Sequence, residues 1–168
     1  MARRARFDLT LETEKFERFT RKLVRGMSQR GASKALRGTA LEFIGRVVDR
    51  TPVRTGRAQW GWTAYAERHG YPHGAGGDDM EGRAEGLEAS SYRDESRGFR
   101  EPFIEIINGV VYIVPLEYGH SEQAPAGFMR ITMREIAAGQ VMTLKLQAEL
   151  ETQIAKANVG AGLGRRRE

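Results

Sequence analysis

An Asn-Gly pair at positions 108 and 109 is the feature that most constrains the fold of this 168-residue chain. Runs rich in Ile and Val flank the pair at residues 103–107 and 110–114. A two-residue hairpin turn needs positive φ at both central positions, which Asn and Gly tolerate better than other residues. The sequence therefore predicts an antiparallel hairpin with Asn108 and Gly109 at its tip and Tyr112 on its second strand.

Helical periodicity precedes this hairpin. Apolar side chains recur every three or four residues over residues 16–24 and again over residues 36–48. Gly26 is the predicted end of the first helix, because glycine commonly follows a helix C-terminus. Ser33 is the predicted start of the second helix. Pro52 ends it, since the residue before a proline disfavours helical backbone.

A strand and a long helix complete the predicted elements. Residues 58–66 alternate apolar and polar side chains, which is the period of a strand with one apolar face. Residues 127–157 form a single helical pattern with a candidate bend at Gly139. We therefore predict an α+β fold in which a small antiparallel sheet with an Asn-Gly hairpin packs against two or three helices, including the long C-terminal helix.

The chain is predicted to form one domain over residues 1–168, with three flexible parts. Positive charge gathers in the first third: residues 1–57 hold 15 Lys and Arg against 6 Asp and Glu. The flexible parts are a basic arm at residues 1–6, a Gly-rich insertion at residues 69–100 and a tail at residues 158–168. The insertion has too few apolar side chains to offset the entropy of ordering it. Basic arms can contact nucleic-acid phosphates, and solvated chain ends are the alternative interpretation.

The absence of cysteine excludes a disulfide framework, Cys-liganded zinc and a thiol nucleophile. No run approaches the roughly 18 consecutive apolar residues of a membrane span. No secretory signal pattern follows Met1. We therefore expect a protein with no membrane partner. These features are compatible with a protein of the cytosol.

Three short patterns suggest catalysis or ligand binding, and each has a simpler interpretation. His120 and Ser121 hint at a nucleophile elbow, but the final glycine and the surrounding βαβ pattern are missing. His69 and His73 have the spacing of two metal ligands on a helix, but a glycine and a proline between them argue against helix. Residues 74–77 are Gly-rich and lack the Gly-Lys-Ser/Thr ending of a phosphate loop.

The acidic cluster and the tryptophan pair also have simpler interpretations than catalysis or ligand binding. Paired catalytic carboxylates need a rigid frame, which the Gly-rich segment around the acidic residues does not offer. Trp60 and Trp62 lie near a basic turn and could form a base-stacking platform, although two tryptophans on one strand face are more often core. The acidic residues are Asp78, Asp79, Glu81, Glu85 and Glu88. We predict no catalytic, cofactor-binding or metal-binding residue.

Two segments, taken in order, resemble a known family. Residues 47–60 pass from a helix into the turn Thr-Pro-Val-Arg-Thr-Gly-Arg. Residues 106–130 contain the Asn-Gly tip, a tyrosine, the loop Leu-Glu-Tyr-Gly-His-Ser with a proline after it, and the start of the long helix. This arrangement resembles the neck and tail-completion proteins of tailed bacteriophages, the gene-product-10-like minor tail components.

The resemblance implies a structural virion protein without catalysis. It would form a six-fold ring in the neck or tail, between a connector or stopper protein and the tail terminator or tail tube, after assembly in the host cytoplasm. Genomic DNA would pass through the ring without sequence-specific binding. The motif and interface residues that the resemblance implies are Pro52, Thr55, Gly56, Arg57, Trp60, Asn108, Gly109, Tyr112, Glu117, Gly119, Ser121 and Pro125.

The two motif segments are expected to act together. We expect the turn at residues 52–57 and the loop at residues 117–125 to fix the sheet to the helices, with a possible contact between Arg57 and Glu117. The hairpin, the insertion and the arms are candidate contacts with neighbours. Two alternatives remain: a small basic nucleic-acid-binding module that uses the Arg-rich arms and the Trp strand, and a hydrolase at Ser121 and His120.

Overall fold

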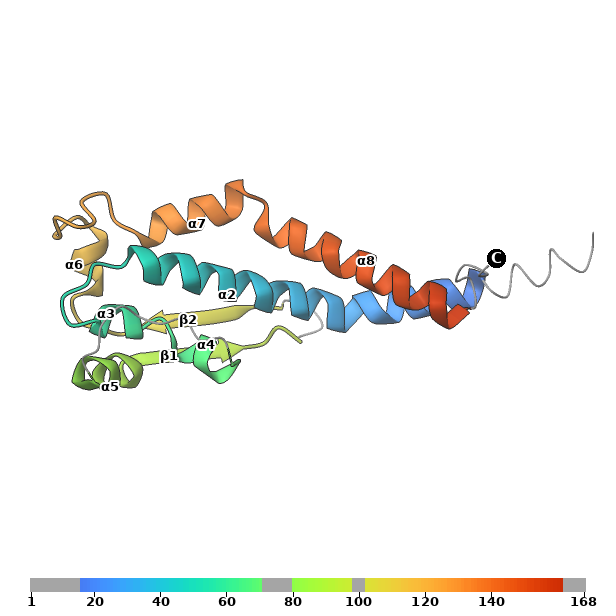
Figure 1. Cartoon of the computed structure of the whole chain (residues 1–168), viewed down its shortest axis with the longest axis horizontal. Helices are drawn as coiled ribbons and strands as arrows, with labels where there is room; N and C mark the ends of the chain where they lie inside the picture. Colours follow the sequence, from blue (N-terminus) through green and yellow to red (C-terminus); the bar gives the residue numbers. More distant parts are fainter. Residues whose placement is uncertain (1–15, 71–79, 98–101, 162–168) are drawn as a thin grey trace, which may run out of the picture.

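The computed structural model describes residues 16–70, 80–97 and 102–161. These residues form an elongated molecule with a compact end and a protruding pair of helices (Figure 1). Within the compact end, helix α2 (Ala32–Arg50) lies between two layers. Helices α7 (Met129–Ala138) and α8 (Val141–Ala161) cover one side of α2, and the sheet and short helices cover the other. The predicted α+β class is confirmed.

The N-terminal helix and α2 are continuous. Residues 16–25 are helical and pass through a π-helical turn, η1 (Gly26–Gly31), directly into α2. The predicted stop at Gly26 is therefore wrong. Gly26 instead lies against the end of the Gln153 side chain on α8. The predicted end of α2 is confirmed, since Thr51 leaves the helix with φ −68° and ψ 125°, immediately before Pro52.

The core lies where α2 meets the short helices and the sheet. Ile44, Val47 and Val48 on α2 are essentially fully buried. They pack with Trp62, Tyr65, Ala66, Ala124 and Phe128, and with the half-buried side chains of Ile104 and Ile106. The apolar face predicted for this helix is thus the face that is buried.

The sheet contains two strands, β1 (Ser90–Asp94) and β2 (Ile104–Asn108), paired antiparallel with Ser90 opposite Asn108. The first run of the predicted hairpin is therefore a strand, but its partner comes from the predicted insertion. Residues 110–114 are not a strand: they lead into helix α6 (Ile113–Glu117). Neither Asn108 nor Gly109 has positive φ, so the pair does not form the hairpin turn that it predicts.

Buried hydrogen bonds explain this departure. The Asn108 side chain donates to the Ala58 carbonyl oxygen at 2.8 Å and accepts from the Val110 backbone N–H at 3.1 Å. An Asn side chain that bonds the backbone two residues on forms an Asx turn. The Gly109 N–H donates to the Ala89 carbonyl oxygen at 2.8 Å. These bonds turn the chain away from the sheet and toward α6, which removes Tyr112 from any strand.

Residues 58–66 are helical rather than extended. Helix α3 (Arg57–Trp60) and helix α4 (Ala64–Arg68) occupy this stretch. Gln59, on the face predicted to be polar, is buried and donates to the carbonyl oxygens of Val48 and Thr51 at 2.9 and 3.3 Å. These two hydrogen bonds to the carbonyl oxygens at the end of α2 favour the helical backbone more than the local apolar–polar alternation favours a strand. Trp62 is nevertheless in the core, as predicted.

The predicted flexible insertion is wrong for residues 80–97. Helix α5 (Met80–Glu88) and strand β1 are ordered there, and Gly86 lets α5 pack on α3, because a Cβ would clash with the Arg57 carbonyl oxygen. Residues 71–79 and 98–101 of that insertion lie outside the described residues, as does the arm at residues 1–6.

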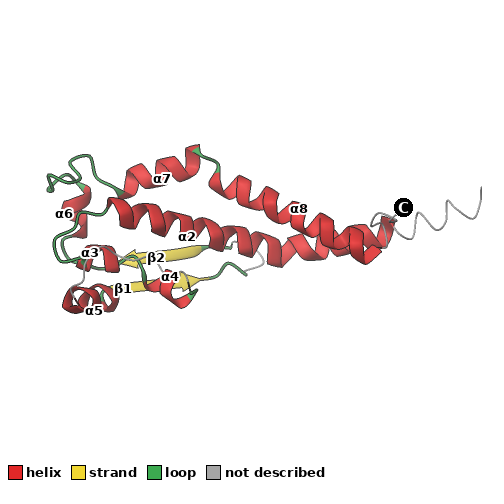
Figure 2. Cartoon of the chain, in the orientation of Figure 1, coloured by secondary structure: helices red, strands yellow, loops and turns green. Residues whose placement is uncertain are grey.

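The C-terminal region forms two helices (Figure 2). The bend predicted at Gly139 is confirmed, and Gln140 follows it with a positive φ of 49°, so the single long helix is wrong. Helix α8 continues to Ala161, which corrects the predicted tail for residues 158–161; residues 162–168 lie outside the described residues. No helix in the described parts of the chain is long and apolar enough to cross a bilayer.

Candidate functional site

The two motif loops meet at one end of the molecule. The Val53 backbone N–H donates to Gln123 Oε1 at 2.8 Å, and Gln123 Nε2 donates back to the Val53 carbonyl oxygen at 3.3 Å. This reciprocal pair joins segments that are 70 residues apart. The prediction that the two loops act together therefore has a physical basis, although it is Gln123 that connects them.

The first loop is held by the end of α2. Thr51 is buried, and its hydroxyl donates to the Val47 carbonyl oxygen at 2.6 Å. Pro52 prevents further helix. Gly56 has φ 78°, a left-handed conformation that side chains with a Cβ rarely adopt. The motif thus forms a defined corner that ends α2 and starts α3.

The second loop is organised by a buried carboxylate. Glu117 accepts hydrogen bonds from the backbone N–H groups of Phe128, Met129 and Arg130 at 2.9, 2.7 and 3.1 Å, which are the first donors of α7. The Arg130 side chain adds an ion pair at 2.9 Å. Burial alone would raise the pKa of Glu117, but these donors together lower it below its usual value. Glu117 therefore caps α7 as an anion.

The predicted contact between Arg57 and Glu117 is wrong. Arg57 forms its ion pair with Glu85 of α5, at 2.9 Å between Nη1 and Oε2. Glu117 is turned inward to the start of α7, where Arg130 is its cationic partner. Glu85 lies in the segment that the sequence predicts to be flexible. No pattern in the sequence marks it as the partner of Arg57.

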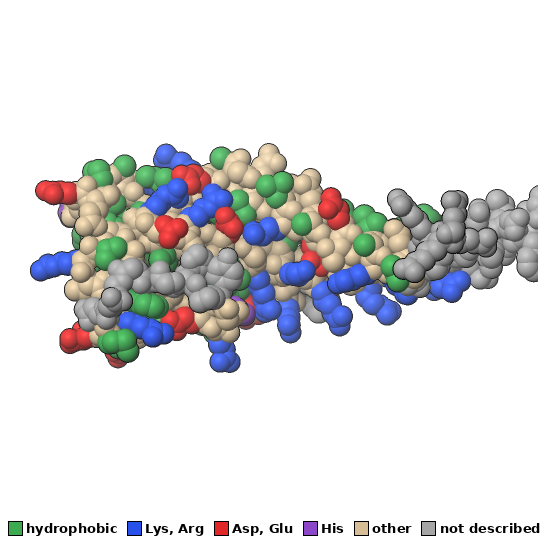
Figure 3. Space-filling model, viewed as in Figure 1, with side chains coloured by type: hydrophobic (Ala, Val, Ile, Leu, Met, Phe, Trp, Pro, Cys, Tyr) green, Lys and Arg blue, Asp and Glu red, His purple; other side chains and the backbone are tan. Residues whose placement is uncertain are grey.

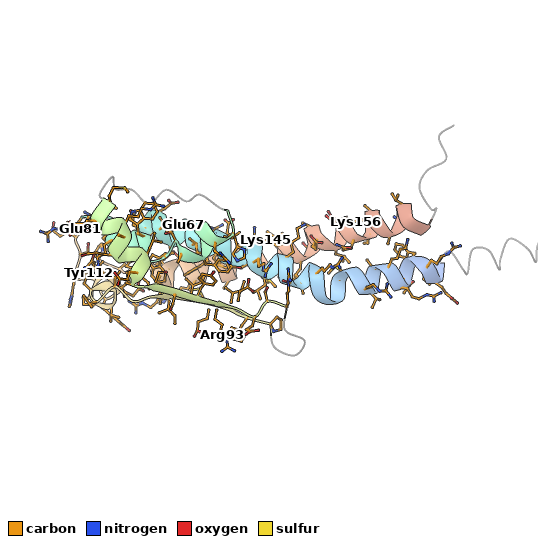
Figure 4. The ribbon with its side chains drawn as sticks, turned by 90° about the horizontal axis from the view of Figure 1, so that it is seen from below. Glu67, Glu81, Arg93, Tyr112, Lys145 and Lys156 are labelled. Carbon is orange, nitrogen blue, oxygen red and sulfur yellow. The ribbon has the colours of Figure 1, made fainter. Side chains whose placement is uncertain are left out.

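A pocket of about 720 Å³ lies between the two loops. Of the predicted motif residues, it contains Pro52, Thr55, Gly56, Arg57, Tyr112 and Ser121. It also contains His120, the second residue of the hydrolase alternative. The other residues in the pocket are outside the predicted motif set: Val53, Arg54, Ala58, Glu85, Pro115, Leu116 and Gln123. Tyr112 lies at the compact end of the molecule, far from Lys156 of α8 (Figure 4).

The remaining predicted residues lie outside this pocket and have structural contacts. Trp60 packs against the core, with the Arg83 guanidinium 4.8 Å from its ring centroid, which agrees with the core position favoured over a base-stacking platform. Asn108 and Gly109 form the turn described above. Gly119 has φ 88° and lies against the Pro125 carbonyl oxygen, where a Cβ would come within 2.6 Å. These residues shape the loops around the pocket.

The pocket shows no activated nucleophile among the described residues. Ser121 Oγ accepts the Gln123 backbone N–H at 3.2 Å, and no hydrogen bond joins it to His120. Within the described ranges, no group of three His, Cys, Asp or Glu side chains could hold a metal ion. His73 and residues 74–79 lie outside those ranges.

Comparisons with family models, with curated proteins and with solved structures find no match for this chain. The resemblance to phage neck proteins therefore rests on the residues of the two motif segments.

Proposed function

We propose that this chain is a structural protein of a tailed bacteriophage, forming a ring in the neck that joins or completes the tail at the head–tail interface. The observation that carries the proposal is the contact between the two motif segments through Val53 and Gln123. A resemblance noted in two separate stretches has more weight when those stretches build one joint. The proposed role is structural and involves no catalysis.

An exposed apolar face beside this joint supports an assembling protein. Val111, Val114 and Tyr118 are 83%, 59% and 66% exposed. Val114 lies on α6, Val111 lies in the turn just before it and Tyr118 is the residue at its C-terminal end. We define these three exposed side chains as the α6 face. Apolar side chains gathered on a surface are typical of a protein interface. We take this α6 face to contact a neighbouring copy of the chain.

A ring places specific demands on that contact. It requires a heterologous interface, in which one surface of each subunit meets a different surface of the next and the rotation closes. The proposed neighbours are further copies of the chain, in a hexamer, together with the connector or stopper and the tail terminator or tail tube. The proposed location is the virion neck, with genomic DNA passing through.

The test combines electron microscopy with genetics. We expect negative-stain images and native mass spectrometry of the purified full chain to show closed rings. The double variant V111D/V114D is expected to be monomeric with an unchanged circular dichroism spectrum. The control M133D, at a 55% exposed apolar position on α7, is expected to keep the rings.

Phage genetics gives the outcome that would refute the proposal. Virions from a phage with this gene disrupted should accumulate as separate heads and tails. Normal joining of heads and tails without the protein would rule out the proposed function.

A further inference from the structure

A row of basic side chains follows one face of the N-terminal helix. Arg18, Arg21, Lys22 and Arg25 occupy positions i, i+3, i+4 and i+7, which place them on one side of an α-helix. All four line the same surface hollow. This helix and the end of α8 form the protruding pair, which we call the stalk and define as residues 16–34 and 149–161.

The π-helical turn keeps the row aligned. Arg30 lies five positions after Arg25, and in a regular α-helix that spacing would rotate Arg30 by about 140° away from the row. The turn η1 (Gly26–Gly31) begins directly after Arg25 and contains Arg30, and a π-helix holds more residues in each turn. Arg30 accordingly lines one hollow with Lys22 and Arg25, and Lys156 of α8 joins them from the other side.

Acidic side chains do not balance this charge. The stalk holds seven Lys and Arg against three Asp and Glu. One carboxylate, Glu149, is buried between the helices, where it accepts from Lys34 at 2.7 Å and from Gln153 at 2.6 Å. Glu17 forms an exposed pair with Arg21, at 3.2 Å. Figure 3 shows Lys and Arg side chains gathered along one edge of the narrow helical part.

From this arrangement, we infer that the basic face of the stalk binds the phosphate backbone of duplex DNA without recognising its sequence. The face presents cations at intervals of about one helical turn, 5.4 Å, along roughly 18 Å of helix from Arg18 to Arg30. A straight, repeating row suits a linear polymer whose charge also repeats, and duplex DNA carries about one charge per 1.7 Å. Four of the seven cations are arginines, whose guanidinium groups bind phosphate in a bidentate manner.

This inference goes beyond the proposed ring and does not depend on it, because a single subunit already carries the whole row. The α6 variant V111D/V114D should lose the ring and keep DNA binding. Failure of ring assembly and failure of DNA binding are thus separate results.

The experiment measures binding of the full chain to a 30-bp duplex of arbitrary sequence by fluorescence anisotropy over a range of salt concentrations. The logarithm of the affinity should fall linearly with the logarithm of salt, with a slope of about −0.9 for each phosphate contact. The variant R18Q/R21Q/R30Q should bind more weakly, with a slope reduced in magnitude by about 2.7. A second arbitrary duplex should bind equally well.

The matched control removes the same charge from the compact end. Arg54, Arg68 and Arg134 are exposed there, and R54Q/R68Q/R134Q should keep nearly the original slope. Equal weakening in the control, or no weakening in the stalk variant, would overturn the inference. So would a complete loss of binding in R3Q/R4Q/R6Q or R165Q/R166Q/R167Q, which would assign the contact to the chain ends. Tighter binding of poly-glutamate than of DNA at equal salt would also overturn the inference, because it would show that the basic face binds an acidic protein.

Discussion

The Glu117 carboxylate lies 2.7 Å from the backbone nitrogen of Met129, and through this contact a residue at the end of α6 caps a helix that begins 12 residues later. The cap holds the two ends of the intervening loop, Glu117 and Met129, next to each other. The contact between the two motif loops depends on this arrangement, because Gln123 lies within the loop.

Removing the charge of Glu117 should destabilise the fold. We expect E117Q to lower the free energy of unfolding by about 1–3 kcal/mol, because charged acceptors form the stronger hydrogen bonds and the site is buried. Urea unfolding measures the difference. The control E122Q alters an exposed residue of the same loop and should stay within about 0.5 kcal/mol of the original. Equal stability of E117Q and E122Q would contradict the capping role.

Acid should destabilise the protein through its buried carboxylates. The pKa of Asp94 is lowered, since hydrogen bonds from Ser96 and the Arg37 guanidinium outweigh the opposing effect of burial, and the pKa of Glu117 and Glu149 is lowered as well. A carboxyl with a depressed folded-state pKa adds stability above its unfolded value near 4 and loses it as the pH falls through the folded value.

Urea unfolding between pH 7 and pH 3 checks this dependence. The free energy of unfolding should be steady near neutrality and fall below about pH 5. The fall should be shallower in E117Q, which cannot titrate at that position. An identical pH profile in E117Q would show that Glu117 does not contribute.

A Cβ at Gly56 should strain the corner after α2. Because Gly56 has φ 78°, we expect G56A to cost about 1–2 kcal/mol, the usual penalty for left-handed backbone in other residues. Thermal unfolding reports the change. The neighbouring variant T55A removes only a long 3.5 Å hydrogen bond to the Arg57 N–H and should have a smaller effect. Full stability in G56A would mean that the corner can adopt another conformation.

The bridge between the two loops should be visible in hydrogen exchange. In Q123A the Val53 N–H loses its acceptor and should exchange faster than in the original chain. Amide exchange followed by NMR measures this at one position. E122A, which alters the adjacent exposed residue, should leave the Val53 rate unchanged. Unaltered exchange in Q123A would argue against the bridge.

A double-mutant cycle separates the two possible partners of Arg57. The ion pair with Glu85 is partly exposed, so we expect a coupling of about 0.2–1 kcal/mol between R57Q and E85Q. We expect no coupling between R57Q and E117Q, because Glu117 is paired with Arg130. Coupling between R57Q and E117Q, with none between R57Q and E85Q, would support the Arg57–Glu117 contact predicted from the sequence.

Local signals predicted several elements correctly. The end of α2 before Pro52 follows from the restriction that proline places on its neighbour. The buried face of α2 follows from helical periodicity, and Ile106 lies in a strand as its Ile-rich surroundings indicate. The association of the two motif loops was also predicted from their order. Apart from the loop association, which joins segments 70 residues apart, each of these properties depends on residues close together in the chain.

Long-range contacts set the remaining features. Residues 110–114 favour a strand by composition, yet the buried hydrogen bond from Asn108 to Ala58, 50 residues earlier, redirects the chain. Residues 58–66 alternate like a strand, yet Gln59 turns inward to satisfy the end of α2. Strand β1 and Glu85 come from a segment whose own apolar content is too low to order it. Neighbouring residues encode backbone preference, whereas burial of polar groups and packing depend on partners that no local pattern can identify.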